Sequence, residues 1–216
     1  MLSLEEYKQN PCGLLSVPYW KAKTLCVPDG MKIVHDRAFS ADSLQNYSDE
    51  PYFRLFHSLE NIIGACPPEI SLVTAVPADT DTIVSVINRS YCDIQVDRRQ
   101  IEAAANSRVH RDCLWILALA SGSGGCAGCG IADFDSEAKE ASLEWIQVLP
   151  EYRRRRIGTA IVTELLRRAQ PFADFATVSG RIGSKNHPET LYRKCGFTGG
   201  DVWHVLRAKP EIPLKN

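Results

Sequence analysis

The sequence predicts an α/β chain in which helices cover the faces of a mixed β-sheet. From residue 70 onward, short apolar runs typical of strands alternate with stretches whose apolar residues recur at helical spacing. Glycine or proline stands at most of the boundaries between them. The resulting order is β, α, α, β, β, β, α, β, α, β, which is typical of a sheet with helices on its faces.

The first 69 residues are interrupted by X-Pro pairs, and the pattern assigns them no regular fold. We expect only a brief helix opened by Ser3 and Glu6, and a strand over residues 31–39. Pro67-Pro68 is the natural boundary, because a proline restricts the residue before it and cannot continue an element. The sequence therefore predicts two parts, an N-terminal extension of residues 1–69 and a domain of residues 70–216.

The strands of the second part are predicted from apolar or alternating runs bounded by turn residues. They cover residues 70–75, 114–120, 130–134, 141–149, 175–182 and 202–208. Residues 121–125 form a glycine and serine turn, so the second and third strands should form a hairpin.

The helices are predicted from a period of 3.6 residues and from their start and stop signals. They cover residues 79–91, 97–106, 158–169 and 188–194. Asp97 followed three residues later by Gln100 is the pattern of a capping box. Pro171 ends the third helix, and Gly196 follows the fourth.

Composition argues against several classes of protein. The 25 basic and 26 acidic residues give a net charge of −1, so we expect no nucleic-acid partner. The longest apolar run, residues 113–120, is far shorter than the ~20 residues that cross a bilayer, and Glu5 and Glu6 do not fit a secretory signal. We therefore predict a cytoplasmic protein without a membrane partner, whose eight cysteines stay reduced.

Residues 143–169, LEWIQVLPEYRRRRIGTAIVTELLRRA, carry the strongest functional signal. A strand leads into a turn of four consecutive arginines, and an amphipathic helix begins directly after it. Free N–H groups and the partial positive charge at a helix N-terminus bind phosphate, and arginines add bidentate partners. This pattern favours a pyrophosphate site, and the alternative is a solvated basic loop. Neither a P-loop pattern nor a Gly-x-Gly-x-x-Gly turn is present.

This stretch resembles motif A of the GNAT superfamily of acetyl-CoA-dependent N-acetyltransferases. In that family a strand, a Pro-Glu-Tyr-Arg turn and a helix hold the pantetheine and pyrophosphate of the cofactor. The family pattern is Gln/Arg-x-x-Gly-x-Gly/Ala, and two registers fit. Spacing from the preceding proline selects residues 153–158, with Arg156 at the first glycine of the pattern, whereas a literal match runs through Arg155, Gly158 and Ala160. We adopt the first register, in which the Arg156 side chain must turn outward.

A second stretch, SKNHPETLYRKCGF at residues 184–197, resembles motif B of the same family. Together the two motifs and their flanks span residues 70–208. The resemblance implies a GNAT-like acyl-CoA N-acyltransferase fold with a mixed, mostly antiparallel central sheet and helices on both faces. It also implies acetyl-CoA as co-substrate and no metal. The cofactor-binding residues it implies are Ile146, Val148, Arg153, Arg154, Arg155, Arg156, Ile157, Gly158, Thr159 and Asn186.

Two residues are candidates for catalysis under this resemblance. Tyr192, on the motif B helix, would stabilise or protonate the leaving thiolate, and the alternative is a packing aromatic. Glu144 is the candidate base, because alternation places it on one face with Ile146 and Val148 and its neighbours could raise its pKa. The alternative is a surface glutamate, since members of the family also use water chains, which Asp133 or Asp135 could supply. Asn186 is also explained as a helix cap.

The reaction implied is transfer of acetyl from acetyl-CoA to a primary amine by direct attack in a ternary complex. The acceptor would be a small-molecule or peptide amine, and an acidic cluster (Asp133, Asp135, Glu137, Glu140, Glu144) hints at a cationic one. The protein would act as a monomer or homodimer, with residues 1–69 covering the acceptor site or a dimer face. The alternative function is a catalytically silent acyl-CoA-binding sensor or interaction module.

Other patterns are interpreted as structural. Cys126-Ala-Gly-Cys129 has metal-like or redox-like spacing, but no second pair stands nearby, and we expect it in the hairpin turn. The five histidines form no cluster in the sequence. Cys195 is expected to be a packing residue rather than a nucleophile.

Overall fold

The structure is a computed structural model that describes residues 3–91, 94–122 and 124–209. The chain forms two compact units. Unit 1 comprises residues 1–55, 179–189 and 199–216, and unit 2 comprises residues 56–178 and 190–198. The predicted division into residues 1–69 and 70–216 stays a prediction.

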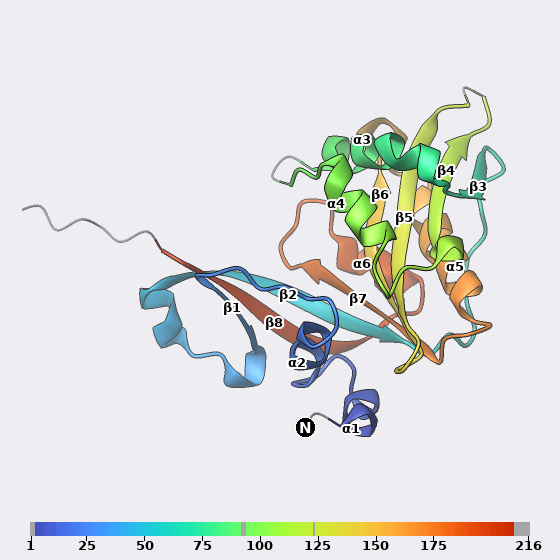
Figure 1. Ribbon diagram of the computed structural model, residues 1–216. Helices are drawn as coiled ribbons and strands as arrows, with labels where there is room; N and C mark the ends of the chain where they lie inside the picture. The colour runs from blue at the N-terminus through green and yellow to red at the C-terminus, as the bar shows by residue number, and fades with distance from the viewer. Residues whose placement is uncertain (1–2, 92–93, 123, 210–216) are drawn as a thin grey trace, which may run out of the picture. The chain divides into compact units, whose positions relative to one another are not determined.

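The core of unit 2 is a mixed sheet in the order β7-β6-β5-β4-β3 (Figure 1). Neighbouring strands pair antiparallel, except that β6 and β7 are parallel. The strands are β3 (Ile70–Thr74), β4 (Trp115–Ala120), β5 (Cys126–Asp135), β6 (Glu140–Val148) and β7 (Phe175–Arg181). The arrangement confirms the predicted class of a mixed, mostly antiparallel sheet.

Helices cover both faces of this sheet. They are α3 (Thr80–Ser90), α4 (Arg98–Ala105), α5 (Ile157–Ala169) and α6 (Pro188–Lys194). Ile131 of β5 is buried in a cluster with residues of α3 and α4, whereas a Cβ at the neighbouring Gly130 would meet Ile161 of α5 at 2.4 Å. Because successive strand residues point to opposite faces, α3 and α4 cover one face and α5 the other, as Figure 1 shows.

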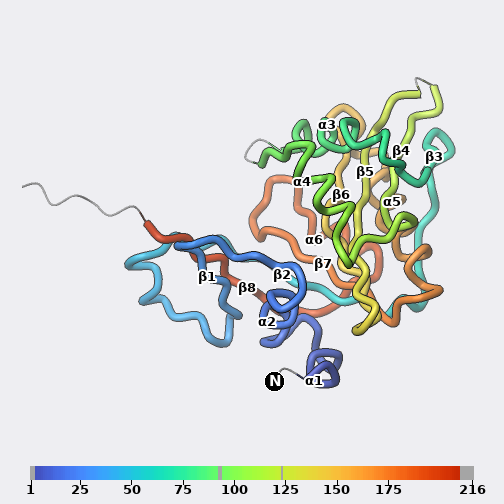
Figure 2. The backbone as a smooth tube through the Cα atoms, viewed as in Figure 1, coloured from blue at the N-terminus to red at the C-terminus, as the bar shows by residue number. Residues whose placement is uncertain are grey.

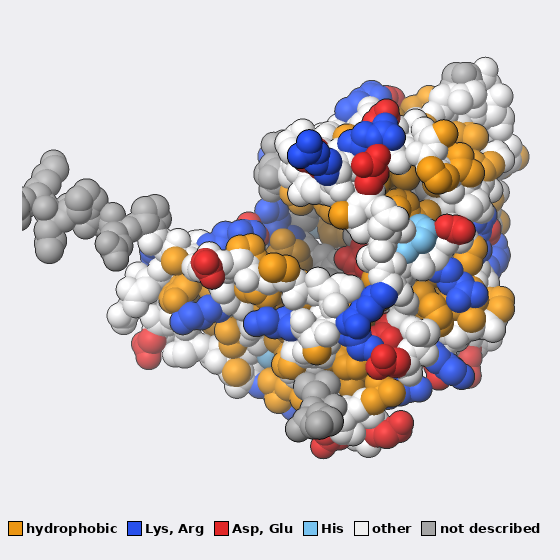
Figure 3. All heavy atoms as spheres, in the orientation of Figure 1, with side chains coloured by type: hydrophobic (Ala, Val, Ile, Leu, Met, Phe, Trp, Pro, Cys, Tyr) orange, Lys and Arg blue, Asp and Glu red, His pale blue; other side chains and the backbone are white. Residues whose placement is uncertain are grey.

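The predicted order of elements from residue 70 is confirmed, including the capping box of Asp97 and Gln100 at α4. Figure 3 shows acidic and basic side chains together near α3 and α4. Arg98 of α4 bonds Asp81 of α3 at 2.8 Å and Glu102 of α4 at 2.7 Å. In the part of the chain that the structure describes, no helix is long and apolar enough to cross a bilayer.

Three strands differ from the prediction. β5 begins at Cys126, so the two cysteines of the Cys-x-x-Cys pattern lie in this strand and not in the turn before it. β8 (Thr198–Ala208) begins four residues earlier than predicted, at Thr198 instead of residue 202. β2 (Tyr47–His57), an 11-residue strand within the stretch expected to be irregular, was missed. Residue 123 of the predicted turn lies outside the described residues.

Unit 1 contains α1 (Leu4–Gln9), α2 (Ser16–Lys21), β1 (Met31–His35) and most of β2 and β8, with the strand order β1-β8-β2. The Ser3 side chain accepts a hydrogen bond from the Glu6 backbone, which confirms the predicted start of α1. The strand expected over residues 31–39 ends at His35 and continues as a short 3-10 helix. β1 and β8 run antiparallel side by side (Figure 2).

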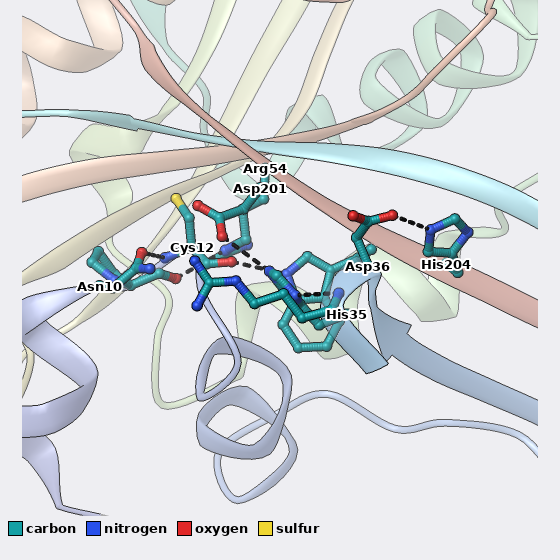
Figure 4. A network of polar contacts seen from close by, with 10 residues as sticks. Asn10, Cys12, His35, Asp36, Arg54, Asp201 and His204 are labelled. Carbon is teal, nitrogen blue, oxygen red and sulfur yellow. Dashed lines mark hydrogen bonds and ion pairs between the residues drawn. The ribbon is translucent and has the colours of Figure 1, made fainter. Parts of the chain in front are cut away.

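A polar network holds the elements of unit 1 together (Figure 4). His35 Nε2 lies 2.9 Å from Asp201 Oδ1, and its Nδ1 accepts from the Arg37 backbone at 3.2 Å. His204 lies between two carboxylates, with Nδ1 2.9 Å from Asp49 Oδ2 and Nε2 3.2 Å from Asp36 Oδ1. Both histidines are buried, and their contacts cross-link β1, β2 and β8, although Asp36 itself is exposed.

Candidate active site

The candidate site in unit 2 lies where β6 extends beyond its pairing with β7. The parallel ladder between β6 and β7 ends at the pair Leu143 and Val178, while β6 continues to Val148. Over these last residues β6 pairs antiparallel with β5, from Gly130 opposite Ile146 to Gly128 opposite Val148. The backbone around Ile146 and Val148 is therefore beyond the parallel ladder, where a ligand with amide groups could pair with it.

Glu144 occupies a β-bulge. Ile131 of β5 pairs with Trp145 and the next residue, Ala132, pairs with Leu143, so Glu144 is an extra residue in β6. A bulge bends the strand and re-aims the side chain at that point. Simple alternation was expected to place Glu144 on the same face as Ile146 and Val148, and the bulge makes this wrong for Glu144. Ile146 and Val148 still share a face, because the pairing with β5 is regular between them.

Two carboxyl groups lie near the bulge. Ser142 Oγ donates to Glu144 Oε1 at 2.8 Å, and Asp133 stands directly opposite Ser142 on β5. Desolvation and, to a smaller extent, the negative charge of Glu144 together raise the pKa of Asp133 to about 8. Glu144 is exposed to solvent, whereas Ser142 is buried. The arrangement can hold a proton on one carboxyl group while the other is ionised.

Tyr192 of α6 is buried and packs edge-on against Phe197 at 5.8 Å between ring centroids. Desolvation raises the pKa of its hydroxyl, with smaller contributions from Tyr91, Cys195 and Glu144. The phenol therefore stays protonated at neutral pH and can donate a hydrogen bond. Glu144 lies near enough for its negative charge to contribute to this shift, and the catalytic roles of both residues stay predictions.

A second tyrosine lines the same region. The Gln147 amide of β6 donates to the Tyr91 hydroxyl at 2.8 Å, and Tyr91 packs edge-on against Trp145 at 6.2 Å. Tyr91, Gln147 and Ser142 are not among the residues predicted for the site from the sequence. Tyr91 directly follows α3, and no sequence signal places it beside β6.

One arginine, Arg153, holds the basic turn in place through its side-chain hydrogen bonds. After a 3-10 turn at Pro150–Tyr152, Arg153 Nε donates to the Val148 carbonyl at 3.1 Å and Nη2 donates to the Ser90 carbonyl at 2.9 Å. This guanidinium is engaged by the protein itself and fixes the turn against the end of α3. Arg154, Arg155 and Arg156 are exposed.

Arg156 has left-handed backbone torsions, with φ 59°. Glycine adopts this conformation at low cost and other residues rarely do. In the first register, Arg156 stands where the family pattern has its first glycine. Its backbone nevertheless has the left-handed conformation that a glycine readily adopts. This observation favours the register over residues 153–158.

The N-terminus of α5 fits a pyrophosphate group. No side chain caps the helix, and the exposed arginines stand directly before it. The first N–H groups of a helix have no intrahelical partner, and here they belong to Ile157, Gly158 and Thr159. A Cβ at Gly158 would lie 3.2 Å from Leu191, so the glycine allows α5 to pack closely against α6. The donor set therefore suits the diphosphate of an acyl-CoA.

Other expected site residues lie elsewhere. Asn186 belongs to unit 1, so its role as a cofactor contact stays a prediction. Two members of the acidic cluster are buried, because Asp135 accepts from the Glu137 backbone at 2.9 Å and Glu140 accepts from Thr177. These two carboxylates cannot attract a cationic acceptor at the surface.

The Cys-x-x-Cys pair is a packing feature. Cys129 is fully buried and Cys126 half-buried in the cluster under α3 and α4, and burial raises the pKa of both thiols. Burial also raises the pKa of Cys195 to about 11. Among residues 3–91, 94–122 and 124–209, no group of three or more His, Cys, Asp or Glu side chains could hold a metal ion.

Comparisons with known proteins agree with the fold. Residues 110–199 match the family model described as the acetyltransferase (GNAT) domain. No curated protein matches the chain. Similar solved structures include a GCN5-related N-acetyltransferase from Sphaerobacter thermophilus, with a TM-score of 0.70 and 19% identity over 87% of this chain and 64% of that chain. The chain thus spans less than two thirds of that structure.

Two further structures show the same fold. Ard1 from Thermoplasma volcanium has a TM-score of 0.52 and 15% identity over 66% of this chain and 99% of that chain. A tandem GNAT protein from the clavulanic acid biosynthesis pathway has a TM-score of 0.61 and 16% identity over 84% of this chain and 65% of that chain.

Proposed function

The chain is a member of the GNAT superfamily, and from this premise we propose that it transfers acetyl from acetyl-CoA to a primary amine by direct attack in a ternary complex. The acceptor is a small-molecule or peptide amine. The proposal places the protein in the cytoplasm, as a monomer or homodimer, without a metal, nucleic acid or membrane partner. The near-balance of acidic and basic residues supports the absence of a polyanionic partner.

One observation carries the proposal. The N-terminus of α5 has no side-chain cap and follows three exposed arginines, directly after the part of β6 that extends past β7. Ile157, Gly158 and Thr159 would bind the diphosphate through their backbone N–H groups. Backbone groups near Ile146 and Val148 would pair with the pantetheine amides. When bound, acetyl-CoA supplies the activated thioester.

The pKa values of the acceptor amine and of the leaving thiol show which step depends most on the protein. A lysine-like ammonium with a pKa of about 10.4 is neutral in roughly one molecule in 10^3.4 at pH 7, which corresponds to about 4.6 kcal/mol. The leaving thiolate, with a thiol pKa of about 8.5, departs with little help. The greater need is a base, and Glu144 at the bulge is our candidate. Tyr192 would stabilise the thiolate through a hydrogen bond or weakly protonate it.

Two measurements test the proposal in sequence. Calorimetry first measures the binding of acetyl-CoA to wild-type protein and to Arg154→Ala/Arg155→Ala, which should bind more weakly. A thiol-release assay with a panel of cationic and neutral amines then measures transfer. Binding with release for one class of amine supports the transferase and identifies the acceptor. Binding without release for any amine supports the acyl-CoA sensor, and the absence of binding contradicts the cofactor site.

A further inference from the structure

The C-terminal end of α6 is closed by a Schellman motif to which Tyr192 belongs. Gly196, which follows the cap, has left-handed torsions with φ 96°. Its N–H donates to the Arg193 carbonyl at 3.1 Å, and the Phe197 N–H donates to the Tyr192 carbonyl at 3.1 Å. The motif is commonly completed by a contact between its first and last side chains, which here are the rings of Tyr192 and Phe197. The position of Tyr192 therefore depends on how α6 ends.

His57, the last residue of β2, packs against this helix end. Its side chain is buried, and its ring meets Phe197 edge-on at 5.2 Å between centroids. A Cβ on Gly196 would lie 2.8 Å from His57 Nε2, so the glycine leaves room for the imidazole. The ring also has a hydrogen bond to the backbone of Cys195, the residue at the cap. Because the last carbonyls of a helix have no partner within the helix, His57 supplies one for α6.

A second contact fixes the orientation of the imidazole. The Leu59 N–H donates to His57 Nδ1 at 2.8 Å, and the Leu59 carbonyl accepts from Gln170 of α5 at 3.0 Å. A ring nitrogen that accepts carries no hydrogen, so the hydrogen of the neutral ring is on Nε2. Burial lowers the pKa of the imidazole, which favours this neutral form. Nε2 is then the atom that donates to the Cys195 carbonyl.

We propose that His57 is a positioning residue for Tyr192, because it accepts from Leu59, donates to the Cys195 carbonyl and so fixes the helix end that carries the tyrosine. This inference rests on the proposed function, in which the Tyr192 hydroxyl bonds the leaving thiolate. His57 acts through the cap of α6 and not on the substrate. A displacement of a reacting group by about 1 Å can lower a rate about 10²-fold, so a loosened cap should reduce turnover.

Two substitutions separate the two hydrogen bonds of the ring. The side-chain nitrogen of glutamine reaches about as far as Nε2, so His57→Gln keeps a donor for the Cys195 carbonyl. The side-chain oxygen of asparagine lies near the position of Nδ1, so His57→Asn keeps an acceptor for Leu59 but loses the donor to Cys195. Both variants remove the buried ring, so a role in packing alone affects both.

The first test needs no substrate. Hydrogen exchange measured by NMR follows the Phe197 N–H, which bonds the Tyr192 carbonyl, relative to the amide of Ile161 in the buried face of α5. This relative exchange should be about tenfold faster in His57→Asn than in His57→Gln, since only the first leaves the Cys195 carbonyl without its donor. Equal exchange in the two variants overturns the proposal.

A matched control comes from a second buried histidine. His35 Nδ1 also accepts from the backbone N–H two residues later, that of Arg37 at 3.2 Å, but His35 belongs to unit 1. His35→Asn should leave the relative exchange of the Phe197 N–H at its wild-type value. A change as large as that in His57→Asn would show a general loss of stability and overturn the assignment to His57.

The second test measures transfer. The kcat of His57→Asn should be at least about tenfold below that of His57→Gln, with the same KM for acetyl-CoA. In the Tyr192→Phe background His57→Asn should cause no further loss, because both changes act on one hydroxyl. Equal kcat values, or a full further loss in that background, overturn the proposal. If no amine is acetylated, the proposed function fails, whereas the exchange of the Phe197 N–H still decides whether His57 holds the end of α6.

Discussion

Arg153 donates from Nε to the carbonyl oxygen of Val148 at 3.1 Å, and this bond joins the basic turn to the end of β6. The same guanidinium reaches the carbonyl of Ser90 at 2.9 Å. The first arginine of the run thus holds the polypeptide, whereas the three that follow are exposed to solvent.

Replacing Arg153 with alanine should lower both stability and cofactor affinity. Its loss leaves two carbonyl acceptors without this donor, so we expect the free energy of unfolding to fall by about 1–3 kcal/mol. Urea denaturation and calorimetric titration with acetyl-CoA measure the two effects. In the control Arg154→Ala, affinity should fall and stability should change by less than about 0.5 kcal/mol. Equal stability of the two variants would contradict the structural role of Arg153.

Arg156→Gly should stabilise the fold. The left-handed torsions of Arg156, with φ 59°, cost a non-glycine residue about 1 kcal/mol, and glycine removes that cost. We therefore expect the urea midpoint to rise. Arg155→Gly is the control, because Arg155 is not among the residues with positive φ and glycine there only adds freedom to the unfolded chain. If both variants are destabilised alike, the conformation at Arg156 is not the source of strain.

Tyr192→Phe should lower kcat and leave the affinity for acetyl-CoA unchanged. The hydroxyl is protonated at neutral pH, since burial raises its pKa, so its removal takes away a hydrogen-bond donor to the thiolate with little change in packing. A decrease of at least about tenfold is expected. Steady-state kinetics and calorimetry measure both quantities. Wild-type turnover in this variant would remove Tyr192 from the mechanism.

Stability should depend on pH through His57. Burial lowers the pKa of this imidazole below its ordinary value of 6.5, and its Nδ1 accepts from the Leu59 backbone at 2.8 Å. The unfolded chain therefore binds a proton at a higher pH than the folded chain. The His57 contribution to the free energy of unfolding is full above about pH 6.5 and is lost as the pH falls through the folded pKa. His57→Gln should show a flatter stability profile in urea titrations at several pH values, and an identical profile would contradict this assignment.

His204→Phe should destabilise unit 1. The ring stacks on Phe39 at 3.9 Å, and phenylalanine would keep that contact but lose both bonds to Asp49 and Asp36. Because Asp49 is largely enclosed, we expect a loss of about 1–3 kcal/mol. Asp36→Asn, at the more exposed partner, should cost less than about 1 kcal/mol. Chemical denaturation followed by tryptophan fluorescence compares them, and the reverse order would contradict the network.

The elements after residue 70 were predictable because each is signalled locally. The Asp97 and Gln100 box starts α4, and Gly196 follows α6. β2 was missed because Pro51 and its acidic neighbours resemble a turn, although proline is tolerated at certain strand positions. A strand of this kind is stabilised by partners distant in the sequence, which a local pattern does not contain.

The site was predictable in part. Arg156 has the left-handed conformation that its register favours. The catalytic roles of Glu144 and Tyr192 stay predictions, although the charge of Glu144 contributes to the raised pKa of Tyr192. The bulge at Glu144 was not predictable, because it depends on how β5 pairs with β6. For the same reason, no local pattern indicated that Asp133 stands opposite Ser142.

A ribosome completes β1 long before β8, yet the two strands pair residue by residue, with Met31 opposite Arg207. Unit 1 therefore cannot close its sheet until the far end of the chain has left the exit tunnel. Most of unit 2, residues 56–178, is continuous and can begin to fold earlier. The nascent chain should thus fold its middle segment first, while β1 remains unpaired until residues 198–208 have been synthesised.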